Sequence, residues 1–320
     1  MPRAEVASTA IEVKHLTRRF GQFVAVNDVS FEVRAGEIFG FLGSNGAGKS
    51  TTIRMLCGLL RPSSGTAVVG GIDVAADPEG VKRRIGYMSQ RFSLYELLTV
   101  DQNIRFFGGV YGLTPERLEA RRAFVIEMAG LRGREQSLAR DLAGGWRQRL
   151  ALGCAILHEP AILFLDEPTG GVDPLSRRQF WRLIDSLARA GVTILVTTHY
   201  LDEAERCHRV TLIHAGRLAA IGTIAEVKRV FAGRPIVEVR TPRATDAMRV
   251  LDEMPAVEKT SLFGTAVHAV LNNSSVQPST IADEVRARGV PVDSIELVEP
   301  SLEDVFLDVV ERAEAESAPS

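Results

Sequence analysis

The chain of 320 residues is 45% hydrophobic and 24% charged, as in globular proteins that bury a sizeable core. Its net charge of −2 and its pI of about 6.3 give no indication of a nucleic acid partner or of an anionic membrane surface as a partner. The sequence contains no signal peptide and no run of about 18 apolar residues, so we expect a cytoplasmic protein without a transmembrane helix.

The first predicted elements are strands. Residues 11–13 and 29–33 alternate between apolar and polar side chains, which indicates half-buried antiparallel strands. Residues 66–69 and 72–74 flank Gly70-Gly71, a dipeptide that favours a hairpin. These segments together predict an antiparallel β subdomain.

Between the two strand pairs lies a glycine-rich segment that fits the pattern G-x-x-x-x-G-K-[ST], namely Gly43-Ser44-Asn45-Gly46-Ala47-Gly48-Lys49-Ser50. The apolar run 38–42 before it predicts a buried strand, and the residues from Thr51 onward predict a helix. Glycines let backbone amides surround an anion, and a helix N-terminus adds partial positive charge. Lys49 can reach the β- and γ-phosphates, and the Ser50 hydroxyl can ligate Mg²⁺. We therefore predict that residues 43 to 51 bind a nucleotide.

From about residue 78 to residue 150 the pattern becomes helical and charged, with few strand candidates. Buried-strand runs return at 161–165 and 192–196, and the helical stretch 175–190 separates them. This alternation is typical of βαβ units in a parallel sheet. The sequence thus predicts an α/β core that contains a helical insertion.

The apolar run that ends at Leu165 is followed by two carboxylates, Asp166 and Glu167. This position places Asp166 at the carboxyl edge of a parallel sheet, where it can hold Mg²⁺ through water. Glu167 can polarise a water molecule for in-line attack on the γ-phosphate. Alone, the pair would fit a simple turn equally well, but the phosphate loop upstream favours catalysis.

The composition changes near Arg234, after which strands and helices follow in the order βαββαβ. This order predicts a small ferredoxin-like α+β domain over residues 235–312, which ends in a helix. Residues 313–320 are of low complexity, and we expect a disordered tail there.

With these motifs in place, residues 11–232 resemble the nucleotide-binding domain of an ABC transporter, with a helical subdomain at about 90–150. The family's signature motif resembles the segment Leu142-Ala143-Gly144-Gly145-Trp146-Arg147-Gln148-Arg149. A helical pattern follows it, so Ala143, Gly144 and Gly145 are expected to form a second anion-binding site at a helix N-terminus. In the family this site serves the nucleotide of the opposite subunit.

The resemblance also implies roles for single residues. Gln90 resembles the glutamine of the family's Q-loop, and His199 resembles the switch histidine that contacts the γ-phosphate. The resemblance thus implies that Glu167, Gln90 and His199 are catalytic. It also implies that Ser50, Gln90 and Asp166 hold Mg²⁺.

Phe20 matches the aromatic residue that stacks on adenine in this family, and Asp173 matches the D-loop aspartate. The chain departs from the pattern at Ala143, where the signature usually has serine, and at Phe20, where tyrosine is commoner. A lost neutral hydrogen bond costs about 0.5–1.5 kcal/mol, so we expect Ala143 to weaken nucleotide contacts without abolishing function.

The resemblance implies a P-loop NTPase that hydrolyses ATP with Mg²⁺ as a subunit of an ABC transporter. A single copy of each motif implies a second copy of the chain in a head-to-tail homodimer that holds two ATP molecules. The permease would be a separate integral membrane protein, with this chain peripheral on the cytoplasmic face of the membrane. The signature and the C-terminal extension are similar to those of bacterial exporters of drug-like, lipidic or polysaccharide cargo.

Three alternatives stay open at this point. The chain could be an importer ATPase subunit, although importers more often carry appended domains of the β-barrel type. It could be a soluble ABC ATPase of translation or DNA repair, although it lacks a second ATPase half and a long heptad insertion. A regulatory module that binds nucleotide without turnover is disfavoured by the presence of Glu167 and His199.

Overall fold

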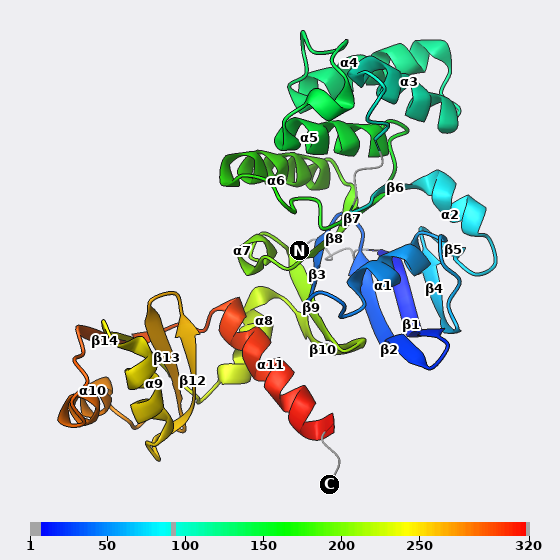
Figure 1. Cartoon of the computed structure of the whole chain (residues 1–320). Helices are drawn as coiled ribbons and strands as arrows, with labels where there is room; N and C mark the ends of the chain where they lie inside the picture. Colours follow the sequence, from blue (N-terminus) through cyan, green and yellow to red (C-terminus); the bar gives the residue numbers. More distant parts are fainter. Residues whose placement is uncertain (1–7, 91–93, 318–320) are drawn as a thin grey trace, which may run out of the picture. The chain divides into compact units, whose positions relative to one another are not determined.

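The computed structural model describes residues 8–90 and 94–317 and divides into two compact units, residues 1–221 and 222–320 (Figure 1). Within these described residues, no helix is long and apolar enough to cross a membrane. The sequence predicted this division into two parts, but it placed the boundary later in the chain.

The first unit contains a four-stranded antiparallel sheet in the order β2-β1-β4-β5. Its strands are β1 (Thr9–Phe20), β2 (Phe23–Arg34), β4 (Ser64–Val69) and β5 (Ile72–Asp73). The φ angles of Gly70 and Gly71 are 57° and 78°, the left-handed conformation that a tight hairpin needs at both positions. The predicted antiparallel subdomain and its Gly-Gly hairpin are thus confirmed.

A second sheet of six strands, in the order β10-β9-β3-β8-β7-β6, forms the centre of this unit (Figure 1). Five of its strands run parallel to their neighbours, and β10 pairs with β9 at one edge. The strands are β3 (Ile38–Leu42), β6 (Ile85–Met88), β7 (Ile162–Asp166), β8 (Thr193–Thr198), β9 (Arg209–His214) and β10 (Arg217–Gly222). Because β3, β7 and β8 are parallel, residues that follow them meet at one edge of the sheet.

The strand β6 differs from the largely helical pattern expected between residues 78 and 150. It has four residues and pairs in parallel with β7 at the sheet edge. A side chain at Gly86 would lie 2.5 Å from the carbonyl oxygen of Ala155, so this strand depends on close packing against the helix that precedes β7. Such a tertiary contact leaves no periodic signal in a segment this short.

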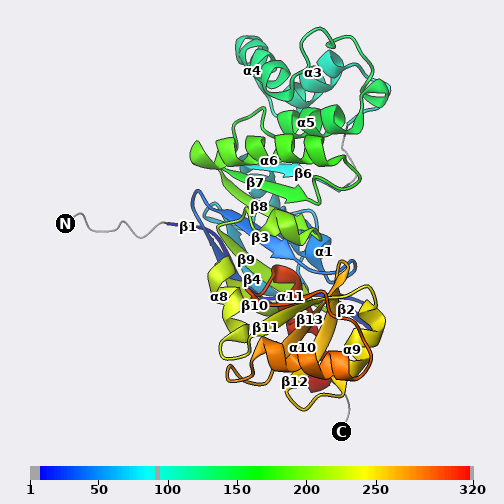
Figure 2. The ribbon, with the colours of Figure 1, turned by 90° about the vertical axis from the view of Figure 1, so that its left-hand side faces the viewer.

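Helices α1 (Lys49–Leu56), α2 (Pro78–Arg84), α6 (Pro174–Arg189) and α7 (Leu201–Ala204) belong to the same unit. A separate group is formed by α3 (Val100–Val110), α4 (Pro115–Ala129) and α5 (Gly144–Ala155), which lie side by side in both ribbon views (Figures 1 and 2). This group has its own apolar core, which includes Ile104, Val125 and Leu150. The helical insertion into an α/β core is thus confirmed.

The second unit contains a four-stranded antiparallel sheet in the order β12-β13-β11-β14. Its elements are α8 (Ile224–Lys228), β11 (Ile236–Arg240), α9 (Ala244–Asp252), β12 (Val257–Phe263), β13 (Ala266–Leu271), α10 (Pro278–Ala287), β14 (Ser294–Val298) and α11 (Leu302–Ser317). The order βαββαβ from β11 to β14 is as expected. The more specific ferredoxin-like assignment stays a prediction.

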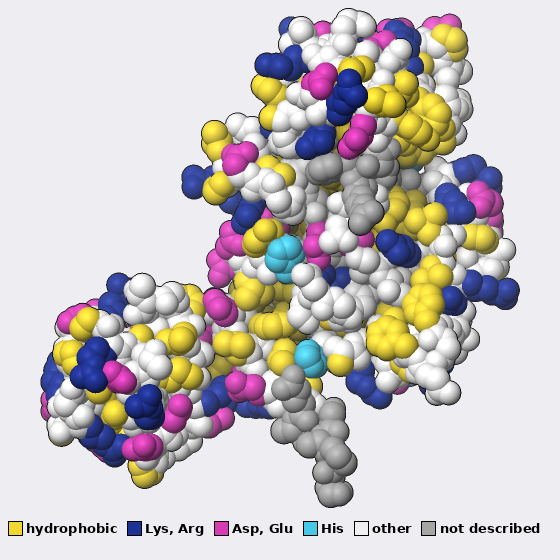
Figure 3. Space-filling model, viewed as in Figure 1, with side chains coloured by type: hydrophobic (Ala, Val, Ile, Leu, Met, Phe, Trp, Pro, Cys, Tyr) yellow, Lys and Arg dark blue, Asp and Glu magenta, His cyan; other side chains and the backbone are white. Residues whose placement is uncertain are grey.

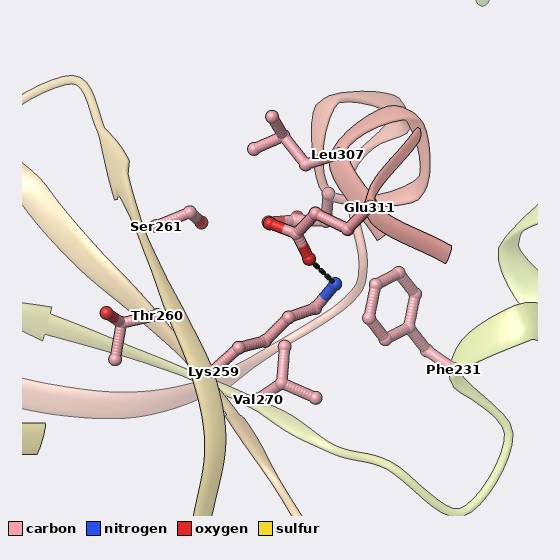
Figure 4. A pocket seen from close by; sticks show the side chains of 8 residues that line it. Phe231, Lys259, Thr260, Ser261, Val270, Leu307 and Glu311 are labelled. Carbon is pink, nitrogen blue, oxygen red and sulfur yellow. Dashed lines mark hydrogen bonds and ion pairs between the residues drawn. The ribbon is translucent and has the colours of Figure 1, made fainter. Parts of the chain in front are cut away.

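Alternate residues of β13 face opposite sides of this sheet. Val267, Ala269 and Leu271 pack in the core with α9 and α10. His268 and Val270 point to the other side, where Val270 lines a small pocket with residues of α11 (Figure 4). Each face of the sheet is therefore covered by helices, which explains why every residue of β13 is buried.

The boundary of this unit lies at residue 222 and not at the predicted residue 235. Phe231 is buried and lines the same pocket as Leu307 of α11 (Figure 4). Arg234 forms ion pairs with Glu258 at 2.5 Å and with Asp308 at 2.8 Å. The change in composition near Arg234 suggested a boundary there, but these contacts tie the segment to the C-terminal unit.

The helix α11 extends to Ser317, so residues 313–317 are helical where the sequence predicted a disordered tail. Alanine and glutamate are favourable helix formers, and they continue a helix whose first part is anchored on the sheet. The last three residues of that predicted tail lie outside the described residues.

Candidate functional site

The loop between β3 and α1 holds the predicted phosphate-binding residues 43–50. A side chain at Gly43 would clash with the carbonyl oxygen of Ile213, and one at Gly48 would lie 2.6 Å from the carbonyl oxygen of Ala25. Gly48 also has a φ of 109° where it begins α1. Glycine is therefore required at both positions, because the backbone of neighbouring strands leaves no room for a side chain.

Lys49 lies beneath this loop and is only 4% exposed. Its Nζ donates to the carbonyl oxygens of Gly43 at 2.8 Å and of Ser44 at 3.1 Å. The ammonium group is thus fixed by the same loop whose amide groups are available to an anion.

Asp166 is the last residue of β7 and is fully buried. Its Oδ1 accepts hydrogen bonds from Ser50 at 3.0 Å and from Thr197 at 2.8 Å, whereas its Oδ2 has no partner among the described residues. Burial raises the pKa of Asp166 above its usual value, and the carboxylate of Glu167 raises it further, against the hydrogen bonds from Thr197 and Ser50. A bound cation would balance the charge of this buried carboxylate and contact the oxygen, Oδ2, that has no partner among the described residues.

These donors fit Mg²⁺, which prefers oxygen ligands and is bound in nucleotide sites by few protein groups and by the phosphates themselves. Ser50 and Asp166 provide two such oxygens, and Gln90 provides a third from an exposed position. The described residues contain no cluster of three or more histidine, cysteine or acidic side chains that could hold a metal alone. A metal here would therefore depend on the phosphates of a nucleotide.

Glu167 connects the catalytic residues predicted from the sequence. Its carboxylate is paired with Lys49 Nζ at 3.1 Å, accepts from Gln90 Nε2 at 3.0 Å and lies 3.4 Å from His199 Nδ1. These partners come from α1, from the end of β6 and from the end of β8. The backbone of Glu167 has a φ of 48°, and its amide donates to Thr197 at 2.8 Å.

A cleft of about 410 Å³ opens over these groups, within the size range of small-molecule sites. Its lining residues come from the β1–β2 hairpin, the phosphate loop, β2, α1 and the loops after β6 and β7, namely Phe20, Phe23, Ala25, Asn45, Gly46, Gly48, Lys49, Ser50, Thr51, Gln90 and Glu167. Half of the nucleotide-binding residues predicted from the sequence therefore line one cleft, namely Phe20 and six residues of the phosphate loop.

Two aromatic rings border this cleft, and only one of them was predicted. Phe20 is 47% exposed, and the guanidinium of Arg18 lies 4.5 Å from the centre of its ring. Phe23 is 63% exposed and also lines the cleft, but the sequence analysis did not select it. Its position at the start of a strand, three residues after Phe20, is the signal that could have identified it.

The signature residues lie outside this cleft. Ala143 precedes α5 and is exposed, and Gly145 leaves no room for a side chain because Ser176 of α6 packs against it. Asp173 is exposed and begins α6, where its carboxylate accepts from the amides of Leu175 and Ser176. Neither Asp173 nor residues 143–145 line the cleft within the same chain, and their expected role toward a second chain stays a prediction.

Comparison with known proteins identifies the family. Residues 26–170 match the family model described as ABC transporter, and residues 222–310 match the model described as ATP-binding protein DrrA1-3-like, C-terminal domain. The daunorubicin/doxorubicin resistance ATP-binding protein DrrA of Streptomyces peucetius is 39% identical over 303 residues, which cover 93% of this chain and 91% of that protein. This chain belongs to the ABC transporter ATP-binding proteins.

Two further relatives agree with this assignment. The linearmycin resistance ATP-binding protein LnrL of Bacillus subtilis is 33% identical over 307 residues, or 94% of this chain and 98% of that protein. A "probable multidrug ABC transporter ATP-binding protein", YbhF of Escherichia coli, is 52% identical over 220 residues. That match covers 69% of this chain but spans only 38% of the length of YbhF.

Solved structures show the same ABC fold. The structure of an ATP-binding subunit of an ABC transporter aligns with 70% of this chain and 94% of its own, at 34% identity and a TM-score of 0.64. A dimeric bacterial ABC transporter cassette aligns with 67% of this chain and 98% of its own, at 25% identity and a TM-score of 0.62. The predicted α/β P-loop core of the ABC type is thus confirmed.

Proposed function

We propose that the chain hydrolyses ATP as the ATPase subunit of a bacterial ABC exporter. The observation that carries this proposal is the position of Glu167, whose carboxylate lies within 3.4 Å of Lys49, Gln90 and His199 at the cleft. A module that only bound nucleotide would not need a buried carboxylate beside the phosphate-binding lysine. Removing a carboxylate from water is costly even when a lysine pairs with it, and a catalytic role would account for such a group at the cleft.

The residues of the cleft have separate roles in this proposal. The amides of the phosphate loop and Lys49 bind the β- and γ-phosphates, while the rings of Phe20 and Phe23 offer apolar faces to the adenine. Ser50 and Asp166 hold Mg²⁺, which neutralises charge on the phosphates when it is bound.

Glu167 is the proposed general base. In this structure its charge is balanced by Lys49, and nucleotide phosphates would compete for the same ammonium group. Once Lys49 turns to the phosphates, the carboxylate is free to accept a proton from an attacking water molecule. Gln90 and His199 contact the same carboxylate, so they are placed to orient it and the water.

We propose that two copies of the chain bind two ATP molecules head to tail. This proposal is supported by the position of Ala143 and Asp173, which are exposed but do not line the cleft of their own chain. A second chain would bring the N-terminus of its α5, with Gly144 and Gly145, to the nucleotide. A related cassette was solved as a dimer, which supports the association of two chains.

We further propose a separate membrane permease as partner, at the cytoplasmic face of the membrane, and an exported cargo of a drug-like or lipidic kind. The relatives named for daunorubicin/doxorubicin and linearmycin resistance support the class of cargo. An apolar patch at the start of the helical group supports a protein partner, because Tyr95 is 49% and Leu97 is 71% exposed. Apolar side chains are visible on this part of the surface in Figure 3.

Hydrolysis of Mg-ATP by the purified chain tests the proposed activity, with Lys49→Ala as the informative variant. Loss of this buried charge should weaken ATP binding and abolish turnover, because no other cation lies beneath the loop among the lining residues. Lys82→Ala is the matched control, since Lys82 is paired with Glu79 on the exposed surface of α2. A wild-type chain that binds ATP without hydrolysing it would contradict the proposal.

The apolar patch can be tested with the double variant Tyr95→Ala and Leu97→Ala. We expect unchanged ATP binding by the isolated chain and reduced co-purification with the permease. The matched control replaces Leu262 and Leu297, two exposed leucines of the second unit, with alanine. Equal co-purification of both double variants with the permease would show that the patch is not the contact.

A further inference from the structure

A buried carboxylate that does not line the cleft connects three segments of the site. Glu203 of α7 is 1% exposed. Its Oε1 accepts from the hydroxyl of Thr169 at 2.6 Å, and its Oε2 accepts from the hydroxyl of Thr198 at 2.7 Å. The guanidinium of Arg177 approaches the same carboxylate at 3.5 Å.

The partners of Glu203 are all neighbours of residues that the proposed function uses. Thr169 follows Glu167 by two positions, and Thr198 directly precedes His199. Arg177 belongs to α6, and its amide donates to the carbonyl oxygen of Asp173, the N-cap residue of that helix. One carboxylate therefore joins the segments after β7 and β8 to the helix that follows the D-loop.

The turn that carries His199 is closed by this carboxylate. The hydroxyl of Thr198 donates to Glu203 and accepts from the amide of Tyr200 at 3.0 Å, while the amide of Glu203 donates to the carbonyl oxygen of Tyr200 at 3.2 Å. The rings of His199 and Tyr200 lie 4.1 Å apart, and the guanidinium of Arg177 lies 4.0 Å from the ring of Tyr200. His199 is thus held on both sides by groups that contact Glu203.

The turn after Glu167 is fixed in a corresponding way. The amide of Gly170 donates to the carbonyl oxygen of Glu167 at 3.2 Å, so Thr169 lies inside a tight turn. Thr169 and Thr198 are each 1% exposed, and Glu203 accepts from both. A fully buried carboxylate is unfavourable unless its oxygens are satisfied. Here each oxygen accepts from one hydroxyl, and the guanidinium of Arg177 lies at ion-pair distance, 3.5 Å.

We infer that Glu203 is a positioning residue that sets the distance between the carboxylate of Glu167 and the ring of His199. This inference rests on the proposed ATP hydrolysis. Glu203 does not touch the cleft, so it should act on the rate of the chemical step and leave nucleotide binding largely intact. Misplacement of catalytic groups by about 1 Å can cost roughly a hundredfold in rate. Loss of the hydrogen bonds between Glu203 and the two threonines should therefore lower the hydrolysis rate measurably.

The sharpest test compares Thr198→Val with Thr198→Ser in the full-length chain. Valine keeps the shape of threonine but removes the hydroxyl, whereas serine keeps the hydroxyl that Glu203 accepts from. We expect Thr198→Val to lower kcat for Mg-ATP hydrolysis about tenfold or more, with the affinity for labelled ATP changed less than about threefold. Thr198→Ser should retain most of the wild-type kcat.

Glu203→Gln extends the test to the carboxylate itself. It should lower kcat like Thr198→Val, and in a Glu167→Gln background it should cause no further loss in single-turnover rate, because there is no base left to position. Asp202→Asn is the matched control, since Asp202 is 73% exposed and contacts the same Arg177 at 3.7 Å. It should leave kcat unchanged.

The outcomes separate this inference from the proposed function. A wild-type chain that does not hydrolyse ATP overturns both. If the wild type hydrolyses ATP but Thr198→Val and Thr198→Ser have equal kcat values, only the positioning role is overturned. The positioning role would also be overturned if Glu203→Gln lowered the single-turnover rate by the same factor in the wild-type and in the Glu167→Gln background. That result would indicate a general loss of folded protein.

Discussion

At the scale of single residues, Glu167 is the most constrained group of the site. Its φ of 48° lies in the left-handed region, which is unfavourable for residues other than glycine. The structure holds it there with a hydrogen bond from its amide to Thr197, whose hydroxyl also donates to Asp166. Thr197 therefore connects Asp166, the proposed Mg²⁺ ligand, to the proposed base Glu167.

Glu167→Gln should keep ATP binding and reduce hydrolysis by roughly a hundred- to ten-thousandfold, as expected for a lost general base. The amide is nearly the same size as the carboxylate, so the contacts with Gln90 and His199 can persist. Unhydrolysed ATP should then hold two chains together in the proposed dimer. Gel filtration with Mg-ATP, compared with ADP, measures this association.

An exposed carboxylate is the control for this prediction. Glu79→Gln on α2 removes a charge of the same kind far from the cleft in sequence and should leave the rate unchanged. Wild-type turnover by Glu167→Gln would reject Glu167 as the base. If Glu167→Gln loses activity but does not associate in the presence of ATP, the catalytic role of Glu167 stands and the proposed ATP-bound dimer is rejected.

The residues that could be predicted from the sequence are those that belong to a motif of fixed spacing. The phosphate loop, Asp166 and Glu167 occupy fixed positions relative to a strand and a helix, so a motif can locate them. Phe23 and Glu203 have no such motif. Phe23 reaches the cleft because a hairpin turns it beside Phe20, and Glu203 matters only because α7 brings it next to two threonines from other segments.

At the scale of secondary-structure elements, charged side chains, several of them buried, take part in the contact between α11 and its sheet. His268 of β13 lies 2.9 Å from Asp304 of α11 and 3.4 Å from Glu238 of β11. Nearby, Lys259 of β12 pairs with Asp308 at 2.7 Å. It also pairs with Glu311 at 2.6 Å (Figure 4). The order βαββαβ predicted a strand here, but it could not predict that His268 faces Asp304, 36 positions onward.

These contacts shift the pKa values of His268 and Asp304 in opposite directions. Burial acts to lower the pKa of His268, but the carboxylates of Asp304 and Glu238 outweigh it and raise the pKa above its usual value. Burial acts to raise the pKa of Asp304, and hydrogen bonds with His268 and Ser301 outweigh it and lower that pKa. Both charged forms are therefore favoured in the folded state.

The attachment of α11 should consequently depend on pH. The stabilisation by His268 is complete below its unfolded pKa of about 6.5 and is lost as the pH rises through its higher folded value. The stabilisation by Asp304 is present above its unfolded pKa of about 3.9 and is lost as the pH falls through its lower folded value. We expect amide exchange in α11 of the full chain, corrected for intrinsic rates, to increase as the pH rises above about 6.5.

His268→Gln should remove this pH dependence, since glutamine cannot become charged. His15→Gln is the matched control, because His15 also pairs with a carboxylate, Asp28, but lies exposed on β1. Exchange in α11 that increases equally with pH in all three proteins would contradict the role of His268.

At the scale of the whole molecule, the chain combines a nucleotide-binding unit with a second unit that has its own apolar core. All residues of the cleft and the signature lie before residue 222. The sequence predicted two parts because each part has its own pattern of strands and helices. It misplaced the boundary because residues 222–234 are bound by long-range partners, which a local change in composition cannot reveal.

The corrected boundary makes a prediction about truncation. A chain that ends at Ile221 should fold and bind ATP with wild-type affinity, because its core and its cleft are complete. A chain that ends at Arg234 should bind ATP equally well but be less soluble, since it exposes Phe231 and leaves Arg234 without Glu258 and Asp308. Equilibrium binding of labelled ATP and sedimentation of the soluble fraction compare the two. If the longer fragment is the more soluble, residues 222–234 belong with the nucleotide-binding unit, and the boundary near 235 is the better one.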